Sequence, residues 1–182
     1  MREYVLGHGR FIAAIIAFVG LLCFVTYSFV SPHGMFSGLQ NDLKSLEPEK
    51  GGTYTDIDGN PVSLARFKGK PLIINSWASW MPFSKDELAL LGDLKAEYGD
   101  RLAVVAMNRM EEPATVRSYL STYGLGEGLV VLLDPTDSFY KTVGGYAMPE
   151  TLFYDADGTL IEHTRGVLNK GELENLASRM SQ

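Results

Sequence analysis

The sequence is almost devoid of cysteine, and its histidines are few and scattered. Cys23 is the single cysteine among 182 residues, so the chain can form neither an intrachain disulfide nor a Cys-x-x-Cys redox or metal site. His8, His33 and His163 lie far apart in the sequence, which gives no zinc-type spacing. We therefore expect neither a metal nor a cofactor.

The chain also lacks an excess of positive charge. It carries 16 Lys and Arg against 22 Asp and Glu, which gives a net charge of −6. An acidic surface repels a phosphate backbone, so we do not expect nucleic acid as a partner. An apolar content of 46% and a length of 182 residues fit one globular domain with additional segments.

One long apolar run lies near the N-terminus, at residues 11–30, and these 20 residues carry no charge. A helix of that length spans about 30 Å, the hydrocarbon thickness of a bilayer. Arg2 and Arg10 precede the run, and no Lys or Arg follows it before Lys44. The positive-inside rule then places residues 1–10 in the cytoplasm and the rest outside. We predict a single-pass signal anchor in the cell membrane and a periplasmic or cell-surface domain.

Three other interpretations fit the apolar run less well. A cleaved signal peptide has a shorter apolar core, of about 7–15 residues, and an A-x-A-like cleavage site. A bacterial lipoprotein needs a small residue before its cysteine, whereas Leu22 precedes Cys23 in the middle of the run. A buried core helix is the third alternative, and 20 uncharged residues at the N-terminus favour a membrane span over it.

Residues 31–50 mix Pro, Gly, Ser and charge, which is typical of a linker. Strand and helix patterns then alternate over residues 51–182. We predict strands at 54–57, 62–64, 71–77, 102–107, 129–133, 151–154 and 159–165, and helices at 82–98, 112–123, 137–143 and 170–180. This order predicts an α/β domain with a central mixed sheet flanked by helices.

The most informative segment precedes the first helix. Residues 77–87 read Trp-Ala-Ser-Trp-Met-Pro-Phe-Ser-Lys-Asp-Glu, the outline of W-C-x-x-C with Met81 and Ser84 at the two cysteine positions. A thioether has no proton to lose and cannot form a disulfide. The hydroxyl of Ser84 is a poor nucleophile without an adjacent base. The segment therefore keeps a redox outline without its thiols.

Four segments, in order and spacing, resemble the thioredoxin superfamily and within it the TlpA/ResA-like branch of membrane-anchored thiol–disulfide oxidoreductases. They are the hairpin at Asp58-Gly59 followed by Leu64, Phe67 and Gly69-Lys70-Pro71, the approach from Ile74 to Trp80, the loop from Tyr146 to Thr151, and the turn from Asp155 to Gly158. The resemblance covers about residues 51–180. It implies a thioredoxin-like fold with an N-terminal β-hairpin extension, and it makes Pro149 the counterpart of the family's cis-proline.

The resemblance also implies where a partner would bind. In the family, the cis-proline loop and the edge of the active site hold an extended peptide. The corresponding apolar patch here would comprise Trp80, Met81, Pro82, Phe83, Met148 and Pro149. We expect a redox-inactive module that binds a protein or an extended peptide at this edge, and we expect no catalytic residue. A degenerate site packed only for stability is the alternative.

Several other interpretations stay open. The chain could be an accessory member of a thiol–disulfide oxidoreductase or cytochrome c maturation pathway that works with a redox-active partner, so the sequence does not decide whether it is an enzyme. Met81 and Met148 could offer two thioethers to Cu(I). Glu87 is either a relic of the family's proton transfer or an acid that favours the helix dipole. Residues 108–112 follow a strand end, where α/β folds often bind ligands, or form a solvated loop.

Overall fold

The computed structural model describes residues 52–180, so the predicted anchor and linker lie outside the described residues. Within residues 52–180, no helix is long and apolar enough to cross a membrane. The structure therefore does not test the predicted membrane span at residues 11–30.

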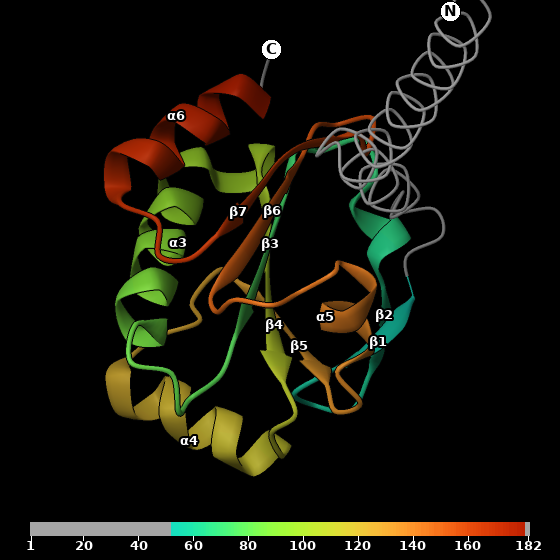
Figure 1. Cartoon of the computed structure of the whole chain (residues 1–182), viewed down its shortest axis with the longest axis vertical. Coiled ribbons are helices and arrows are strands. Elements are labelled where there is room, and N and C mark those ends of the chain that lie inside the picture. The colour runs from blue at the N-terminus through green and yellow to red at the C-terminus, as the bar shows by residue number, and fades with distance from the viewer. Residues whose placement is uncertain (1–51, 181–182) are drawn as a thin grey trace, which may run out of the picture. The chain divides into compact units, whose positions relative to one another are not determined.

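A single mixed sheet forms the centre of the domain, as predicted (Figure 1). Its strand order is β2-β1-β5-β4-β3-β6-β7. The strands are β1 (Thr53–Asp56), β2 (Pro61–Ser63), β3 (Leu72–Trp77), β4 (Ala103–Arg109), β5 (Val130–Asp134), β6 (Glu150–Tyr154) and β7 (Leu160–Arg165). Strands β3, β4 and β5 are parallel, and the remaining pairs are antiparallel. β3 is buried at all six positions because helices cover both faces of the sheet.

Helices cover the two faces unequally. They are η1 (Leu64–Phe67), α3 (Ser84–Tyr98), η2 (Gly99–Arg101), α4 (Pro113–Tyr123), α5 (Ser138–Thr142) and α6 (Lys170–Met180). Apolar side chains of α3, α4 and α6 pack on one face, while η1 and α5 pack on the other (Figure 1). The bounds of α6 agree with the sequence prediction, because Leu173 and Leu176 recur at helical spacing and are both buried.

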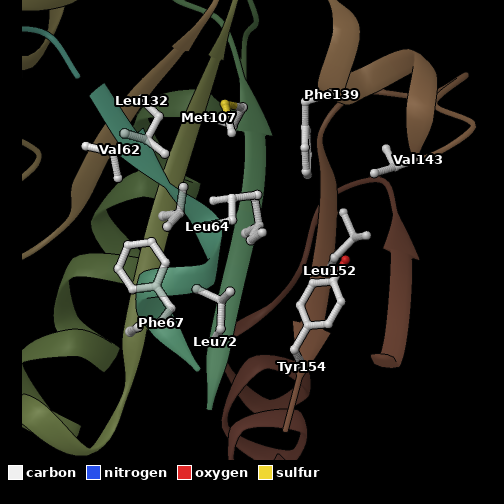
Figure 2. Packing of buried hydrophobic residues seen from close by; sticks show 13 residues of the cluster. Val62, Leu64, Phe67, Leu72, Met107, Leu132, Phe139, Val143, Leu152 and Tyr154 are labelled. Carbon is white, nitrogen blue, oxygen red and sulfur yellow. The ribbon is translucent and has the colours of Figure 1, made fainter. Parts of the chain in front are cut away.

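The core on the η1 and α5 face packs α5 against the sheet (Figure 2). Phe139 of α5 and Val143, the residue directly after α5, pack in one cluster with Leu72 of β3 and Leu152 of β6. The buried carboxylate of Asp134, at the end of β5, accepts hydrogen bonds from the first backbone N–H groups of α5. α5 is thus held both at its N-terminus and along its apolar face. This fixes the position at which the loop before β6 begins.

Most predicted element boundaries differ from the observed ones by one or two residues, and two of these differences have a clear local cause. Helix α3 begins at Ser84, not at Pro82, because a turn with hydrogen bonds from Met81 N to Ala78 O and from Ser84 N to Met81 O comes first. Leu64 begins a 3-10 helix and does not extend the strand before it, because the Ser63 hydroxyl accepts a hydrogen bond from Ala65 N.

Candidate functional site

The sheet brings the two predicted site loops to one end. β3 and β6 run antiparallel with Ser76 opposite Glu150, so the chain leaves β3 beside the point where Pro149 leads into β6. The Met148–Pro149 peptide bond is cis, as predicted. β7 ends here as well, since Arg165 pairs with Glu150. Three loops thus surround the start of α3.

Met81 corrects part of the predicted apolar patch. Its side chain is 5% exposed, so it belongs to the interior and not to a partner-facing surface. The turn that precedes α3 bends the chain back at this point, with Met81 N bonded to Ala78 O, 3.1 Å away. A buried Met81 also gives no support to a copper site shared with Met148. Within the described residues, no group of three or more His, Cys, Asp or Glu could hold a metal ion.

Ser84 is committed to a structural hydrogen bond. Its side chain is fully buried, and its Oγ donates to Ala78 O at 2.7 Å. Donation to a carbonyl uses the hydroxyl proton and provides no base to remove it. The residues predicted to stand at the two thiol positions are therefore both parts of the packed start of α3.

The rest of the predicted patch divides into exposed and sheltered residues. Trp80 is 65% exposed and Phe83 is 50% exposed, and Pro82 between them is exposed as well. We call these three residues the Trp80 lip. Met148 is half-buried and Pro149 is buried. The lip is therefore the solvent-exposed part of the predicted patch.

The carboxylate of Glu111 fixes the base of the lip, a role that the sequence did not indicate. Glu111, just after β4, accepts hydrogen bonds from Ser79 N at 2.8 Å, from Ser79 Oγ at 2.5 Å and from Asn108 Nδ2 at 2.7 Å. Asn108 is fully buried. The loop after β4 is thus tied to the loop after β3, and the alternative of a merely solvated loop is wrong for Asn108 and Glu111.

Glu87 lies inside the domain and is not an exposed acid of the helix. It is 2% exposed. Its Oε2 accepts a hydrogen bond from Asn75 Nδ2 at 3.0 Å, and its Oε1 accepts one from Leu168 N at 3.3 Å. Burial raises the pKa of Glu87 to about 7, and these two hydrogen bonds only partly oppose the shift. A favourable helix dipole alone does not account for a carboxyl group buried in this way.

A second buried acid, Glu150, holds the cis-proline loop. Its Oε1 accepts hydrogen bonds from Tyr146 N at 2.9 Å and from Ala147 N at 3.2 Å, and its Oε2 lies 2.9 Å from His163 Nε2. Arg165 lies 3.6 Å away. Burial by itself would raise the pKa of Glu150, but the hydrogen bonds from His163 and the two backbone N–H groups outweigh it and lower that pKa.

Sequence reasoning missed this cluster, although a signal was present. Glu150 is an acidic residue at the first position of an apolar strand, and His163 and Arg165 alternate with period two along the next strand. In an antiparallel hairpin such residues share one face. The same loop is also fixed by Tyr140, whose hydroxyl donates to Ala147 O at 2.6 Å.

Large exposed apolar side chains concentrate at this end of the sheet. Six are exposed in the described chain, and five of them lie in the loops that follow β3, β4 and β7 or precede β6: Trp80, Phe83, Met110, Tyr146 and Val167. The sixth, Tyr123 of α4, lies under the ammonium group of Lys85 in the first turn of α3. These exposed apolar side chains therefore gather at the end of the sheet that carries the predicted site.

Comparison with known proteins agrees with this geometry. The family model described as Redoxin matches residues 44–179. The chain is 26% identical over 128 residues to "Thiol-disulfide oxidoreductase ResA" of Bacillus thuringiensis subsp. konkukian (strain 97-27), which covers 70% of this chain and 73% of the relative. It is 29% identical over 121 residues to "Thioredoxin-like protein YneN" of Bacillus subtilis (strain 168), which covers 65% of this chain and 69% of the relative.

Solved structures share the fold. The structure of MTB dsbF in its mixed oxidized and reduced forms superposes with a TM-score of 0.67 at 20% identity, covering 73% of this chain and 97% of that one. A putative thiol:disulfide interchange protein DsbE from Chlorobium tepidum gives a TM-score of 0.66 at 19% identity, covering 72% and 93%. Both likenesses show a thioredoxin-like fold.

Proposed function

The chain belongs to the redoxin family, in the TlpA/ResA-like branch of the thioredoxin superfamily, and from this we propose that it is a membrane-anchored extracytoplasmic domain that binds a protein partner without exchanging disulfides. The globular part supplies the binding surface at the end of the sheet that carries the Trp80 lip. The anchor at residues 11–30 rests on the apolar run and on the positive charges before it.

The absence of thiols carries the proposal. Residues 52–180 contain no cysteine, and the single Cys23 belongs to the predicted membrane span. Disulfide exchange needs a thiolate to attack a sulfur and a second thiol to resolve the mixed disulfide. A domain with Met81 and Ser84 at the start of α3 offers neither group, so what it can still do is hold a partner.

The retained surface supports binding. The Trp80 lip is exposed although its base is fixed by Glu111, and the loop of Tyr146 and Met148 is fixed by Glu150. Rigid aromatic side chains on fixed loops lose little conformational entropy when a partner binds. Exposed aromatic side chains on fixed loops are better explained by partner binding than by packing for stability alone.

The test is capture of partners by the tagged full-length chain from membranes dissolved in mild detergent. Trp80→Asp and Phe83→Asp place a charge in the lip, and both should lose the partners that the wild type retains. Thr159→Asp is the matched control, because it places the same charge in the exposed turn at the opposite end of β6 and β7. Capture of the same partners by all four chains would refute a binding role for the lip.

A second candidate is suggested by the relatives named as thiol-disulfide oxidoreductases. The chain would then assist a thiol–disulfide or cytochrome c maturation pathway in which a redox-active partner supplies the cysteines. Alkylation of the captured partner distinguishes the two candidates. A reactive Cys-x-x-Cys pair in that partner favours the accessory role, and a partner without reactive thiols excludes it.

The assignment of the two thiol positions is tested by restoring them. Met81→Cys combined with Ser84→Cys should give the full-length chain measurable insulin reductase activity. Ser84 begins α3 and Met81 lies three residues before it, where the N-terminus of the helix favours a thiolate. Glu87, with a pKa of about 7, lies three residues further on and would exchange protons near neutral pH. A folded but inert double mutant would mean that these are not the thiol positions.

A further inference from the structure

Helix α4 presents a surface almost without charge. Its 11 residues contain one charged side chain, Arg117, which is paired with Asp58 at 2.8 Å. By comparison, α3 carries six charged residues in 15, and α6 carries four in 11. The outer face of a surface helix is normally charged, whereas the centre of a protein interface is depleted of charge. The composition of α4 is thus that of an interface.

A groove follows this helix and reaches the base of the Trp80 lip. Its volume is about 550 Å³, and it is lined by Ser79 and by Ala114, Thr115, Ser118, Tyr119, Thr122 and Tyr123 of α4. The α4 residues form a stripe along the whole helix, because they recur at helical spacing. A helix of this length is about 16 Å long, which matches about five residues of an extended chain.

The groove combines free hydroxyl groups with a fixed aromatic floor. Within residues 52–180, the hydroxyls of Thr115, Ser118, Tyr119 and Tyr123 have no hydrogen-bond partner, whereas that of Ser79 is taken by Glu111. The rings of Tyr119 and Tyr123 lie 4.9 Å apart, and Tyr119 also lies 5.5 Å from Trp77. Tyr and Ser side chains in such an arrangement offer hydrogen bonds and apolar contact at low entropic cost, as in antibody paratopes.

The charges beside the groove indicate the sign of its occupant. Glu111 lies 2.5 Å from the Oγ of Ser79, which lines the groove. Burial, Tyr123, Asp86 and Glu111, in that order, raise the pKa of Tyr119. Lys85 lies 5.2 Å from the ring centre of Tyr123, so two acids stand against one base beside the groove. The acidic net charge of −6 opposes the approach of a second copy of this chain. A segment with Lys or Arg beside uncharged side chains is therefore the complementary occupant.

We propose that the groove on α4 binds an extended, basic segment of the same partner that contacts the Trp80 lip. The inference rests on the proposed function and extends it, because it assigns the partner a second contact on the α4 side of Trp80. Hydroxyls along α4 would bind the backbone of the segment, and its basic side chains would lie toward Asp86 and Glu111. Trp80, next to Ser79 in the chain, joins the lip to the groove.

The test uses three fluorescent peptides that share tyrosine, serine and leucine residues and differ in carrying lysines, no charge or glutamates. Their affinities for the full-length chain in detergent micelles are measured by fluorescence anisotropy. We expect the lysine peptide to bind at least about tenfold more tightly than the glutamate peptide, and the difference to shrink as salt is added. Equal affinity for both charged peptides would overturn the proposal.

Substitutions on one helix locate the contact. Ser118→Lys and Thr115→Lys fill the groove and should weaken binding of the lysine peptide at least about tenfold. Ser121→Lys adds the same charge to an exposed position of α4 that does not line the groove, and it should change the affinity less than about twofold. Circular dichroism verifies that each variant is folded. Equal losses for Ser118→Lys and Ser121→Lys would overturn the proposal.

The remaining outcomes separate the inference from the proposed function. If Trp80→Ala weakens binding while Ser118→Lys and Thr115→Lys do not, the lip binds a partner and the groove does not. If neither kind of variant weakens binding, both proposals fail. The other possible occupant is a second copy of this chain, and sedimentation of the chain alone tests for it. If the chain self-associates and Ser118→Lys abolishes the association, the groove binds a second copy and the proposal is overturned.

Discussion

Two buried glutamates lie at the end of the sheet that carries the site, and they differ in character. Glu87 ties the first turn of α3 to Asn75 and Leu168 and is 2% exposed, while Glu150 supports the cis-proline loop and is 0% exposed. The pKa of Glu87 is raised to about 7, whereas that of Glu150 is lowered. Two carboxyl groups with similarly low solvent exposure thus shift in opposite directions.

The groups around each carboxylate explain the difference. Glu150 accepts two backbone hydrogen bonds and lies beside His163 and Arg165. Glu87 accepts one amide and one backbone hydrogen bond, and within residues 52–180 it has no ion-pair partner. Burial disfavours the charge in both cases, and enough donors reverse that effect in one. The cis-proline loop is therefore held by a charge, whereas α3 is tied to β3 and to Leu168 by a carboxyl group that is half-protonated near neutral pH.

The largest effect should follow from removing the charge of Glu150. Glu150→Leu leaves His163, Arg165 and two backbone N–H groups without their buried acceptor, so we expect a loss of about 3–5 kcal/mol in the free energy of unfolding. Urea denaturation of the full-length chain measures it. Glu162→Leu in the neighbouring strand is the control, because its carboxylate is half-exposed and should cost less than about 1 kcal/mol. A similar loss in the free energy of unfolding for both variants would show that the charge of Glu150 has no special structural role.

The pH dependence of stability sharpens the comparison. The pKa of Glu87 rises from an ordinary 4.5 to about 7 on folding, so the folded state binds more protons between these values and stability falls as pH rises through them. The loss should begin near pH 4.5, be complete just above pH 7 and amount to about 3 kcal/mol. Glu150 acts in the opposite direction, because its lowered pKa makes its contribution present above the unfolded value and lost as pH falls through the folded one.

Glu87→Gln separates the two acids. The variant cannot ionise, so the decrease in stability between pH 4.5 and pH 7 should disappear while the acid-side loss from Glu150 stays. Gln fits the site because the Oδ1 of Asn75 has no partner, and an amide flip lets Asn75 accept a hydrogen bond from it. Glu97→Gln, at an exposed position of the same helix, controls for the loss of one charge. An unchanged slope in Glu87→Gln would contradict the assignment of this pH range to Glu87.

The sequence predicted those parts of the structure that depend on residues close together in the chain. Apolar runs bounded by Gly and Pro predicted the buried strands, and helical spacing predicted α6 with its observed bounds, because both patterns record burial residue by residue. The resemblance to the thioredoxin superfamily predicted the cis bond before Pro149, which spacing and composition could not have shown.

Sequence reasoning failed where distant residues decide the outcome. The burial of Met81 depends on a turn whose geometry no local pattern records, so an apolar residue in a loop was assigned to the surface. Glu150 and His163 are 13 positions apart, and only the register of β6 on β7 brings them together. The uncharged face of α4 was visible in the sequence, but its meaning required the groove beside it.

A smaller effect tests the loop on the Glu87 side. Ser84→Ala removes a buried hydrogen bond to Ala78 O, so we expect a loss of about 1 kcal/mol, since that carbonyl still accepts a hydrogen bond from Met81 N. Ser118→Ala is the control, because its hydroxyl is exposed and has no partner within the described residues, and it should change stability by less than about 0.5 kcal/mol. Equal losses would show that the Ser84 bond does not hold this loop.

The smallest effects should come from the aromatic tips of the two loops. Trp80→Ala should change the free energy of unfolding by less than about 0.5 kcal/mol, because the side chain is 65% exposed. Tyr146→Ala should cost up to about 1 kcal/mol, because the Arg165 guanidinium lies 4.9 Å from its ring centre. If the two loops are held by Glu111 and Glu150, their tips are free to contact a partner. Partner binding should then fall in Trp80→Ala while the urea midpoint stays the same. A loss of stability above about 2 kcal/mol for Trp80→Ala would make the lip part of the packed domain, and the loss of a partner in that variant would then no longer identify a contact.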